Sequence, residues 1–287
     1  MGWGLDIPPP SGAFVTVDGA KVHYVRKGSG PALVLIHGAS GNLRDWTFQH
    51  VDRLAEQYDV IAIDRPGHGH SDRVPRGDDP RVQARHMQKA LAALGVERAV
   101  VAGHSFGGTV ALAWAVTLPE TVSGLCLIAA PSHRWEGSVA KIYVLTDHWL
   151  LGPLIAFLYP LVASDRLIRD TLDRVFAPGS APDGYADHIH PNLALRYNSV
   201  RWNAADVARL KPRVVEMTQH YPALTMPIEM IHGTGDETVP FDIHTARLID
   251  AVPNGTLTKL EGVGHMPHHT RAAEVFAALD RLRATAG

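Results

Sequence analysis

The sequence has little cysteine and no excess of charge of either sign. One of its 287 residues is cysteine, Cys126, so the chain cannot form an internal disulfide. Lysine and arginine number 27 against 29 acidic residues, which gives a net charge of −2. No broad positive field is available to attract nucleic acid, and we expect no nucleic-acid partner. A lone cysteine in the apolar run 124–130 suits a buried position and a reducing, cytoplasmic environment.

Targeting signals and an uninterrupted apolar run are also missing. The first twelve residues have no basic segment followed by an apolar core, and Asp6 stands where a myristoylation signal has Ser or Thr. The mostly apolar segment 142–163 is interrupted by Asp147, Pro153 and Pro160. Proline breaks helix hydrogen bonding, and a charge at bilayer depth costs about 3 kcal/mol. We therefore expect a lid over a substrate pocket, with transient membrane contact as an alternative, and no stable membrane insertion.

Short β-branched runs alternate with helical patterns along most of the chain, which is typical of a mostly parallel sheet with crossover helices. Strands are expected at 14–17, 22–26, 32–37, 60–64, 99–102, 122–130, 228–232 and 256–260, and helices at 43–57, 82–94, 109–118, 241–251 and 270–284. Between 132 and 224 no strand pattern occurs and prolines are frequent. The sequence predicts an α/β core, residues 1–131 and 225–287, with a helical cap or lid, residues 132–224, inserted after the sixth strand.

The strongest chemical signal is Gly-His-Ser-Phe-Gly at 103–107, between a predicted strand and a predicted helix. Glycines are needed there because the turn is too tight for side chains, and the strained turn lifts the serine oxygen clear of the sheet. Ser105 is therefore the candidate nucleophile. An inert serine in a glycine-rich turn is the alternative, which the strand before it and the helix after it disfavour. Ser71 lies in a similar motif that lacks the second glycine and a strand directly before it.

A serine hydroxyl needs a general base, and the base needs an orienting acid. Asp236 follows the predicted strand 228–232, and His265 follows the strand 256–260 after a glycine-containing loop. The chain order Ser, Asp, His is the one used by hydrolases with this type of serine turn. Because the carboxyl ends of parallel strands meet at one edge of a sheet, we expect the three side chains to converge.

Other residues could compete for these roles. The rival bases are His268 and His269, and the rival acids are Glu237 and Asp242. A zinc site built from His265 and its two histidine neighbours lacks an acidic or cysteine partner at matching spacing, so we expect no metal. The segment 28–30 lacks the third glycine of a dinucleotide site and no P-loop lysine motif occurs, so we expect no cofactor.

From about residue 22 to the last helix, the sequence resembles capped members of the α/β-hydrolase superfamily, namely bacterial esterases and carbon–carbon bond hydrolases of aromatic degradation. His-Gly-Ala at 37–39 resembles the oxyanion-loop motif of that family, and the segment 64–71 resembles its structural turn. The resemblance implies an oxyanion hole formed by the backbone N–H groups of Ala39 and Phe106, where one donor contributes about 3 kcal/mol. Related dehalogenases and epoxide hydrolases carry aspartate where this chain has Ser105.

Four polar residues near these motifs are expected to have structural roles. His37 would support the oxyanion loop, and His104 would pack and form hydrogen bonds beneath the nucleophile. Asp64 and Arg65 would stabilise their own turn.

The expected function is hydrolysis of a small to medium, largely apolar carboxylic ester through an acyl-enzyme. One alternative is a carbon–carbon bond hydrolase acting on a vinylogous diketone, which needs a polar cap subsite with an arginine such as Arg196 or Arg201. A perhydrolase or an amidase would use the same catalytic residues. An alternative of another class is a ligand receptor on a hydrolase scaffold, with little turnover. In each case the partner is a small molecule, and the protein is a monomer or a homodimer.

Overall fold

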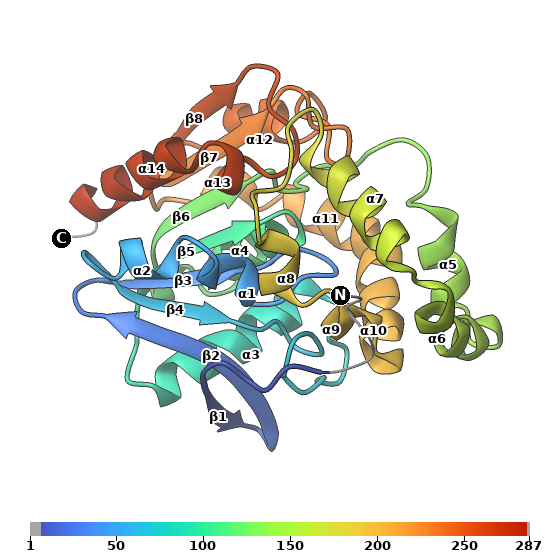
Figure 1. Ribbon diagram of the computed structural model, residues 1–287. Coiled ribbons are helices and arrows are strands. Elements are labelled where there is room, and N and C mark those ends of the chain that lie inside the picture. Colours follow the sequence, from blue (N-terminus) through green and yellow to red (C-terminus); the bar gives the residue numbers. More distant parts are fainter. Residues whose placement is uncertain (1–6, 286–287) are drawn as a thin grey trace.

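The computed structural model describes residues 7–285 as one eight-stranded sheet covered by helices on both faces (Figure 1). The strands, in chain order, are β1 (Ala13–Val17), β2 (Ala20–Gly28), β3 (Ala32–Ile36), β4 (Asp59–Ile63), β5 (Ala99–His104), β6 (Val122–Ile128), β7 (Ile228–Gly233) and β8 (Gly255–Leu260). They lie in the order β1-β2-β4-β3-β5-β6-β7-β8. The mostly parallel sheet predicted from the sequence is confirmed, because only the pairings of β2 with β1 and β4 are antiparallel.

Both faces of the central strands are buried, which explains their continuous apolar runs. In β3, Val34 and Ile36 pack on one face with helices α3 (Pro80–Ala93) and α4 (Phe106–Thr117). Leu33 and Leu35 alternate with them and pack on the other face with helix α14 (Ala272–Thr285). Successive side chains of a strand point to opposite faces, so a strand between two helical layers has no polar side.

The helix predicted at 43–57 is wrong in extent, because the chain forms two short helices, α1 (Arg44–Thr47) and α2 (Val51–Leu54). Trp46 and Val51 both enter the same core cluster although five positions separate them. One straight helix cannot present that spacing on one face, so the chain turns between them. The remaining helices outside the predicted cap are α12 (Thr245–Ala251) and α13 (Pro267–Thr270), with a 3₁₀ turn at Pro119–Thr121.

Residues 129–227, between β6 and β7, contain helices and no strand. These helices are α5 (Lys141–Asp147), α6 (Leu151–Val162), α7 (Asp165–Phe176), α8 (Tyr185–Ile189), α9 (Asn192–Leu195), α10 (Tyr197–Ala208) and α11 (Leu210–Thr218), followed by a 3₁₀ turn at Tyr221–Ala223. They lie beyond the carboxyl ends of β5 and β6 (Figure 1). We keep the name cap for residues 132–224; the prediction that they form a lid over a substrate pocket stays a prediction.

Among residues 7–285, no single helix is long and apolar enough to cross a membrane. Helices α6 and α7 pass that test of length and composition only as a pair, and they are bent by 100°. The predictions that the amino terminus has no secretory signal and no myristoylation signal rest partly on residues 1–6. These residues lie outside the described part of the chain.

Candidate active site

Ser105 stands in a sharp turn between the end of β5 and the start of α4. Its φ of 53° and ψ of −123° lie outside the regions that non-glycine residues prefer. The flanking glycines permit this turn, because a Cβ at Gly103 would lie 2.2 Å from the carbonyl oxygen of Gly107. A Cβ at Gly107 would lie 2.4 Å from the carbonyl oxygen of Ile36 in β3. The Ser105 N–H donates to the carbonyl of Ile128, which anchors the turn to β6.

The structure brings His265 and Ser105 together although 160 positions separate them. His265 follows β8, and its Nε2 atom lies 2.9 Å from Oγ of Ser105. Its Nδ1 atom lies 2.6 Å from Oδ2 of Asp236, which follows β7. An ionised carboxylate only accepts, so Nδ1 carries the ring proton and Nε2 is left to accept the serine proton.

Asp236 is buried and surrounded by donors. Its Oδ1 accepts from the backbone N–H groups of Thr238 and Val239, both at 2.8 Å. Its Oδ2 accepts from His265 and also lies 3.1 Å from Nε2 of His232, which donates to the carbonyl of Val239. Burial opposes ionisation, but the His265 ring and these hydrogen bonds outweigh it and hold the pKa of Asp236 below its usual value. The carboxylate is therefore ionised at neutral pH.

The rival base and acid residues lie elsewhere. His268 and His269 direct their Nε2 atoms at Asp45, at 3.1 Å and 2.7 Å. Glu237 and Asp242 are exposed, whereas Asp236 is buried against the imidazole. Of the candidate bases and acids, His265 contacts Ser105, and Asp236 contacts His265.

The predicted oxyanion loop follows β3 and lies beside Ser105. Ala39 lines the same cavity as Ser105, and Phe106 is the first residue of α4, where a backbone N–H has no partner inside the helix. The cap contacts this loop directly, because Asn203 of α10 accepts from the Ser40 N–H at 2.7 Å. The roles of Ala39 and Phe106 stay a prediction.

Arg65 does more than stabilise its own turn, which corrects the expectation from the sequence. Its guanidinium donates to the carbonyls of His37 and Gly38, both at 3.1 Å, and to Asp206 of α10 at 3.0 Å. Asp206 is fully buried and also lies 2.7 Å from Arg73. Asp64 stabilises its turn by accepting from the His70 N–H, but it also accepts from the Leu43 N–H and from Nδ1 of His23, so it too acts beyond its own turn.

His37 supports the loop as a neutral side chain. Its Nε2 accepts from the Arg65 N–H at 3.0 Å, while Nδ1 donates to the Gly38 carbonyl at 2.9 Å. Burial and the nearby Arg65 charge lower the pKa of His37 to about 4. The uncharged ring can therefore accept a hydrogen bond at neutral pH, which fits the structural role expected from the sequence.

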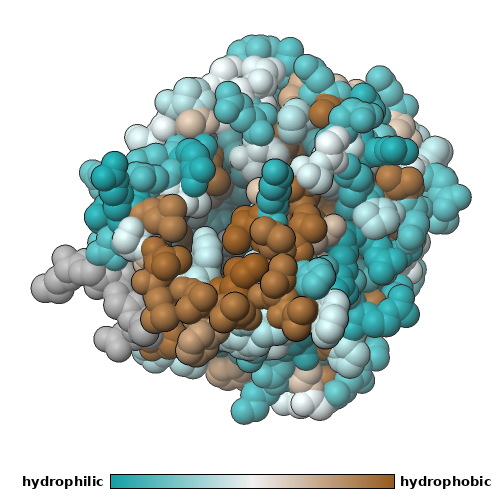
Figure 2. All heavy atoms as spheres, turned by 90° about the vertical axis from the view of Figure 1, so that its right-hand side faces the viewer, coloured by the Kyte–Doolittle hydropathy of each residue, from teal (hydrophilic) through white to brown (hydrophobic). Residues whose placement is uncertain are grey.

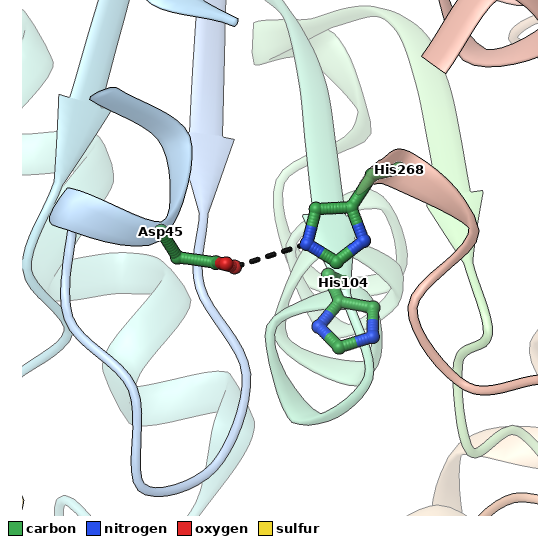
Figure 3. Close-up of side chains that lie close together, drawn as sticks. All are labelled: Asp45, His104 and His268. Atoms are coloured by element: carbon green, nitrogen blue, oxygen red, sulfur yellow. Dashed lines mark hydrogen bonds and ion pairs between the residues drawn. The ribbon is translucent and has the colours of Figure 1, made fainter. Parts of the chain in front are cut away.

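A buried group of histidines around Asp45 lies directly beneath the site. Sequence analysis does not predict this group, because its members come from distant segments of the chain. His104 donates from Nε2 to the carbonyl of His265 at 2.8 Å and packs its ring 4.2 Å from that of His268 (Figure 3). Burial and the neighbouring His265 lower the pKa of His104 to about 3. His104 thus holds the His265 backbone as a neutral ring.

Asp45 joins this group to the cap. The Tyr185 hydroxyl of α8 donates to Oδ1 of Asp45 at 2.7 Å. Burial alone would raise the pKa of Asp45, but His268 and His269 beside it lower it well below the usual value. Ligand atoms of Asp45, His104 and His268 lie within 4.8 Å of one another (Figure 3). Both carboxylate oxygens already accept hydrogen bonds, and we interpret the group as an anchor for the His265 loop.

A cavity of about 340 Å³ opens at Ser105, between the core and the cap. Helices α5 to α7 supply much of its apolar wall, for example Ile142, Leu167 and Val175. None of the described side chains that line it is a lysine or an arginine. A cavity of this size and character suits a small or medium uncharged ligand.

Comparison with known proteins identifies the fold family of the chain. A family model described as alpha/beta hydrolase fold matches residues 31–272. An uncharacterised protein of Mycobacterium tuberculosis is 30% identical over 98% of this chain and 83% of its own length. The chain is similar to the esterase RhEst1 of Rhodococcus sp. ECU1013, with a TM-score of 0.76, 23% identity, and coverage of 96% of this chain and 98% of the esterase. It is also similar to a membrane phospholipase A, with a TM-score of 0.71, 26% identity, and coverage of 94% and 86%.

Proposed function

The chain belongs to the α/β-hydrolase fold family, and on that basis we propose that it is a serine hydrolase of small to medium, largely apolar carboxylic esters. The observation that carries the proposal is the continuous line from Asp236 through His265 to Oγ of Ser105, with contacts of 2.6 Å and 2.9 Å. A hydroxyl, an imidazole and a carboxylate in this arrangement move a proton off the serine as it attacks a carbonyl.

In the proposed reaction, Ser105 attacks the ester carbonyl while His265 takes its proton. The backbone N–H groups of Ala39 and Phe106 stabilise the negative oxygen of the tetrahedral intermediate. The intermediate collapses to an acyl-enzyme, and His265 returns the proton to the departing alcohol. Water then attacks the acyl-enzyme with His265 again as base, which releases the acid and restores Ser105. Asp236 stabilises the imidazolium formed in each half of the cycle.

The cavity lining favours an ester over the alternative carbon–carbon cleavage. A vinylogous diketone from aromatic degradation carries a carboxylate, for which Arg196 or Arg201 was the expected partner. Neither arginine is among the described residues that line the cavity, and its wall is mainly apolar. The likeness to a membrane phospholipase A, at 26% identity, also favours ester hydrolysis.

The proposal is tested with p-nitrophenyl esters of increasing acyl length. We expect rapid turnover, with kcat/KM that rises with chain length until the cavity is filled and then falls. A fluorophosphonate should label one peptide, the one containing Ser105, and the label and turnover should both disappear in Ser105→Ala. Labelling at another residue would refute the mechanism. Tight ligand binding with negligible turnover would favour the receptor alternative.

A further inference from the structure

The cap carries on its outer side a set of exposed apolar side chains that we call the apolar ridge. Its members lie on and just before α6: Trp149, Leu150, Leu151, Leu154, Phe157, Leu158, Leu161 and Val162. Trp149 is 78% exposed, Leu161 68% and Phe157 65%. Figure 2, which faces the side of the molecule that holds α5 and α6, shows a contiguous hydrophobic area. Contiguous patches of this kind mark interaction surfaces on soluble proteins.

Packing inside the cap does not account for the ridge. The buried residues of α6 are the small ones, Gly152 and Ala156, one turn apart. A Cβ at Gly152 would lie 2.1 Å from the carbonyl oxygen of Thr146, so the close approach of α6 to α5 requires glycine there. The large apolar side chains of α6 point outward instead. A helix that faces water normally has the reverse arrangement.

We propose that the apolar ridge docks reversibly on the surface of a zwitterionic lipid bilayer. Residues 148–163 contain no Asp, Glu, Lys or Arg, and residues 141–176 contain four Asp against four Lys or Arg. The attraction is therefore hydrophobic and does not depend on anionic lipid. The 12 residues of α6 span roughly 18 Å, less than the roughly 30 Å of a hydrocarbon core, so the helix lies in the interface.

A lipid surface fits the ridge better than a second copy of the chain does. Stable protein interfaces carry about one hydrogen bond per 100–200 Å² and a polar rim that fixes the register of the partners. The side chains of the ridge offer a single polar group, the indole N–H of Trp149. Indole rings prefer the boundary between lipid and water, where this group stays hydrated. A lipid surface requires no register.

The ridge and the cavity share the same helices. Tyr159 of α6 and Ile142, Tyr143 and Thr146 of α5 line the cavity at Ser105, whereas the ridge side chains do not. Docking would therefore bring the wall of the cavity close to the lipid surface, where an apolar ligand concentrates. Binding itself does not depend on the proposed ester hydrolysis, and it can be measured with the nucleophile removed.

The test uses full-length Ser105→Ala protein and phosphatidylcholine vesicles in a sedimentation assay. We expect vesicle binding that is unchanged between low and high salt and that weakens at least about tenfold in Trp149→Ser/Phe157→Ser/Leu161→Ser. A control with the same number of exposed apolar side chains removed elsewhere, Phe14→Ser/Tyr197→Ser/Val215→Ser, should bind like the parent. With Ser105 restored, the ridge variant should hydrolyse a soluble ester at the wild-type rate.

Absence of vesicle binding by the parent protein, or equal binding by the ridge variant, would overturn the proposal. Binding that needs anionic lipid and is lost in high salt would overturn its hydrophobic basis. A dimer in sedimentation velocity that dissociates in the ridge variant, without vesicle binding, would assign the ridge to a second copy. Failure of the ester assay alone would refute the proposed function and leave the docking result standing.

Discussion

The substitution Asp236→Asn separates the orienting role of this side chain from its size. Oδ1 of Asp236 accepts two backbone N–H groups, from Thr238 and Val239. An asparagine must keep its carbonyl oxygen there, because an amide NH₂ would face two donors. The NH₂ group then replaces Oδ2 and donates toward Nδ1 of His265. The ring is forced into the tautomer that carries its proton on Nε2, and it can no longer accept the proton of Ser105.

The expected loss follows from this reversal of the tautomer. We expect kcat/KM for a p-nitrophenyl ester to fall about 10⁴-fold, or about 5.5 kcal/mol of transition-state stabilisation. The NH₂ group also meets the ring N–H of His232, which lies 3.1 Å from Oδ2, so stability should fall by about 1–3 kcal/mol. Steady-state kinetics and urea unfolding measure the two effects separately.

Asp242→Asn and Glu237→Gln are the matched controls, since both residues are exposed and were rival acids. Each should stay within about twofold of wild type, as expected for surface changes. If Asp236→Asn remained folded and kept activity within about tenfold of wild type, the assigned relay would be wrong. A loss of comparable size in Asp242→Asn would identify a different orienting acid.

Three further changes probe the groups that hold the site. Asp206→Asn leaves the buried charge of Arg65 and the partly buried charge of Arg73 poorly paired, so the free energy of unfolding in urea should fall by about 3–5 kcal/mol; an unchanged value would contradict this pairing. Asn203→Ala removes the acceptor of the Ser40 N–H, and kcat should fall about tenfold in steady-state assays. His50 has its pKa lowered to about 4 by burial and by His269, so it is neutral in the folded protein. Stability is therefore lost as pH falls from about 6.5 to 4, and His50→Gln should reduce that slope by up to about 1.4 kcal/mol per pH unit in melts between these pH values.

Local patterns determined much of the fold and the three residues of the candidate site. The glycines at 103 and 107 mark a turn that other residues cannot form, because any Cβ there meets backbone atoms within 2.2–2.4 Å. Successive side chains of the central strands point into two different helical layers, and this accounts for the continuous apolar runs of those strands. Such constraints act between residues close together in the chain, and they can therefore be predicted from the sequence. The helix predicted at 43–57 failed because its apolar spacing changes at residues 46–51, which only the packed core shows to be a turn.

The tertiary structure alone decided which distant groups meet. The order of β5, β6, β7 and β8 in the sheet places the loops after β5, β7 and β8 at one edge, so His265 reaches Ser105 while His268 and His269 turn to Asp45. Arg65, which follows β4, reaches Asp206 of α10 in the cap because the cap packs over this edge of the sheet. These contacts join residues 141 to 224 positions apart. The strand pattern of the sequence predicted that residues 105 and 265 converge, but not the contacts of His268, His269 and Arg65, because strand pairing and packing of the cap set those distances.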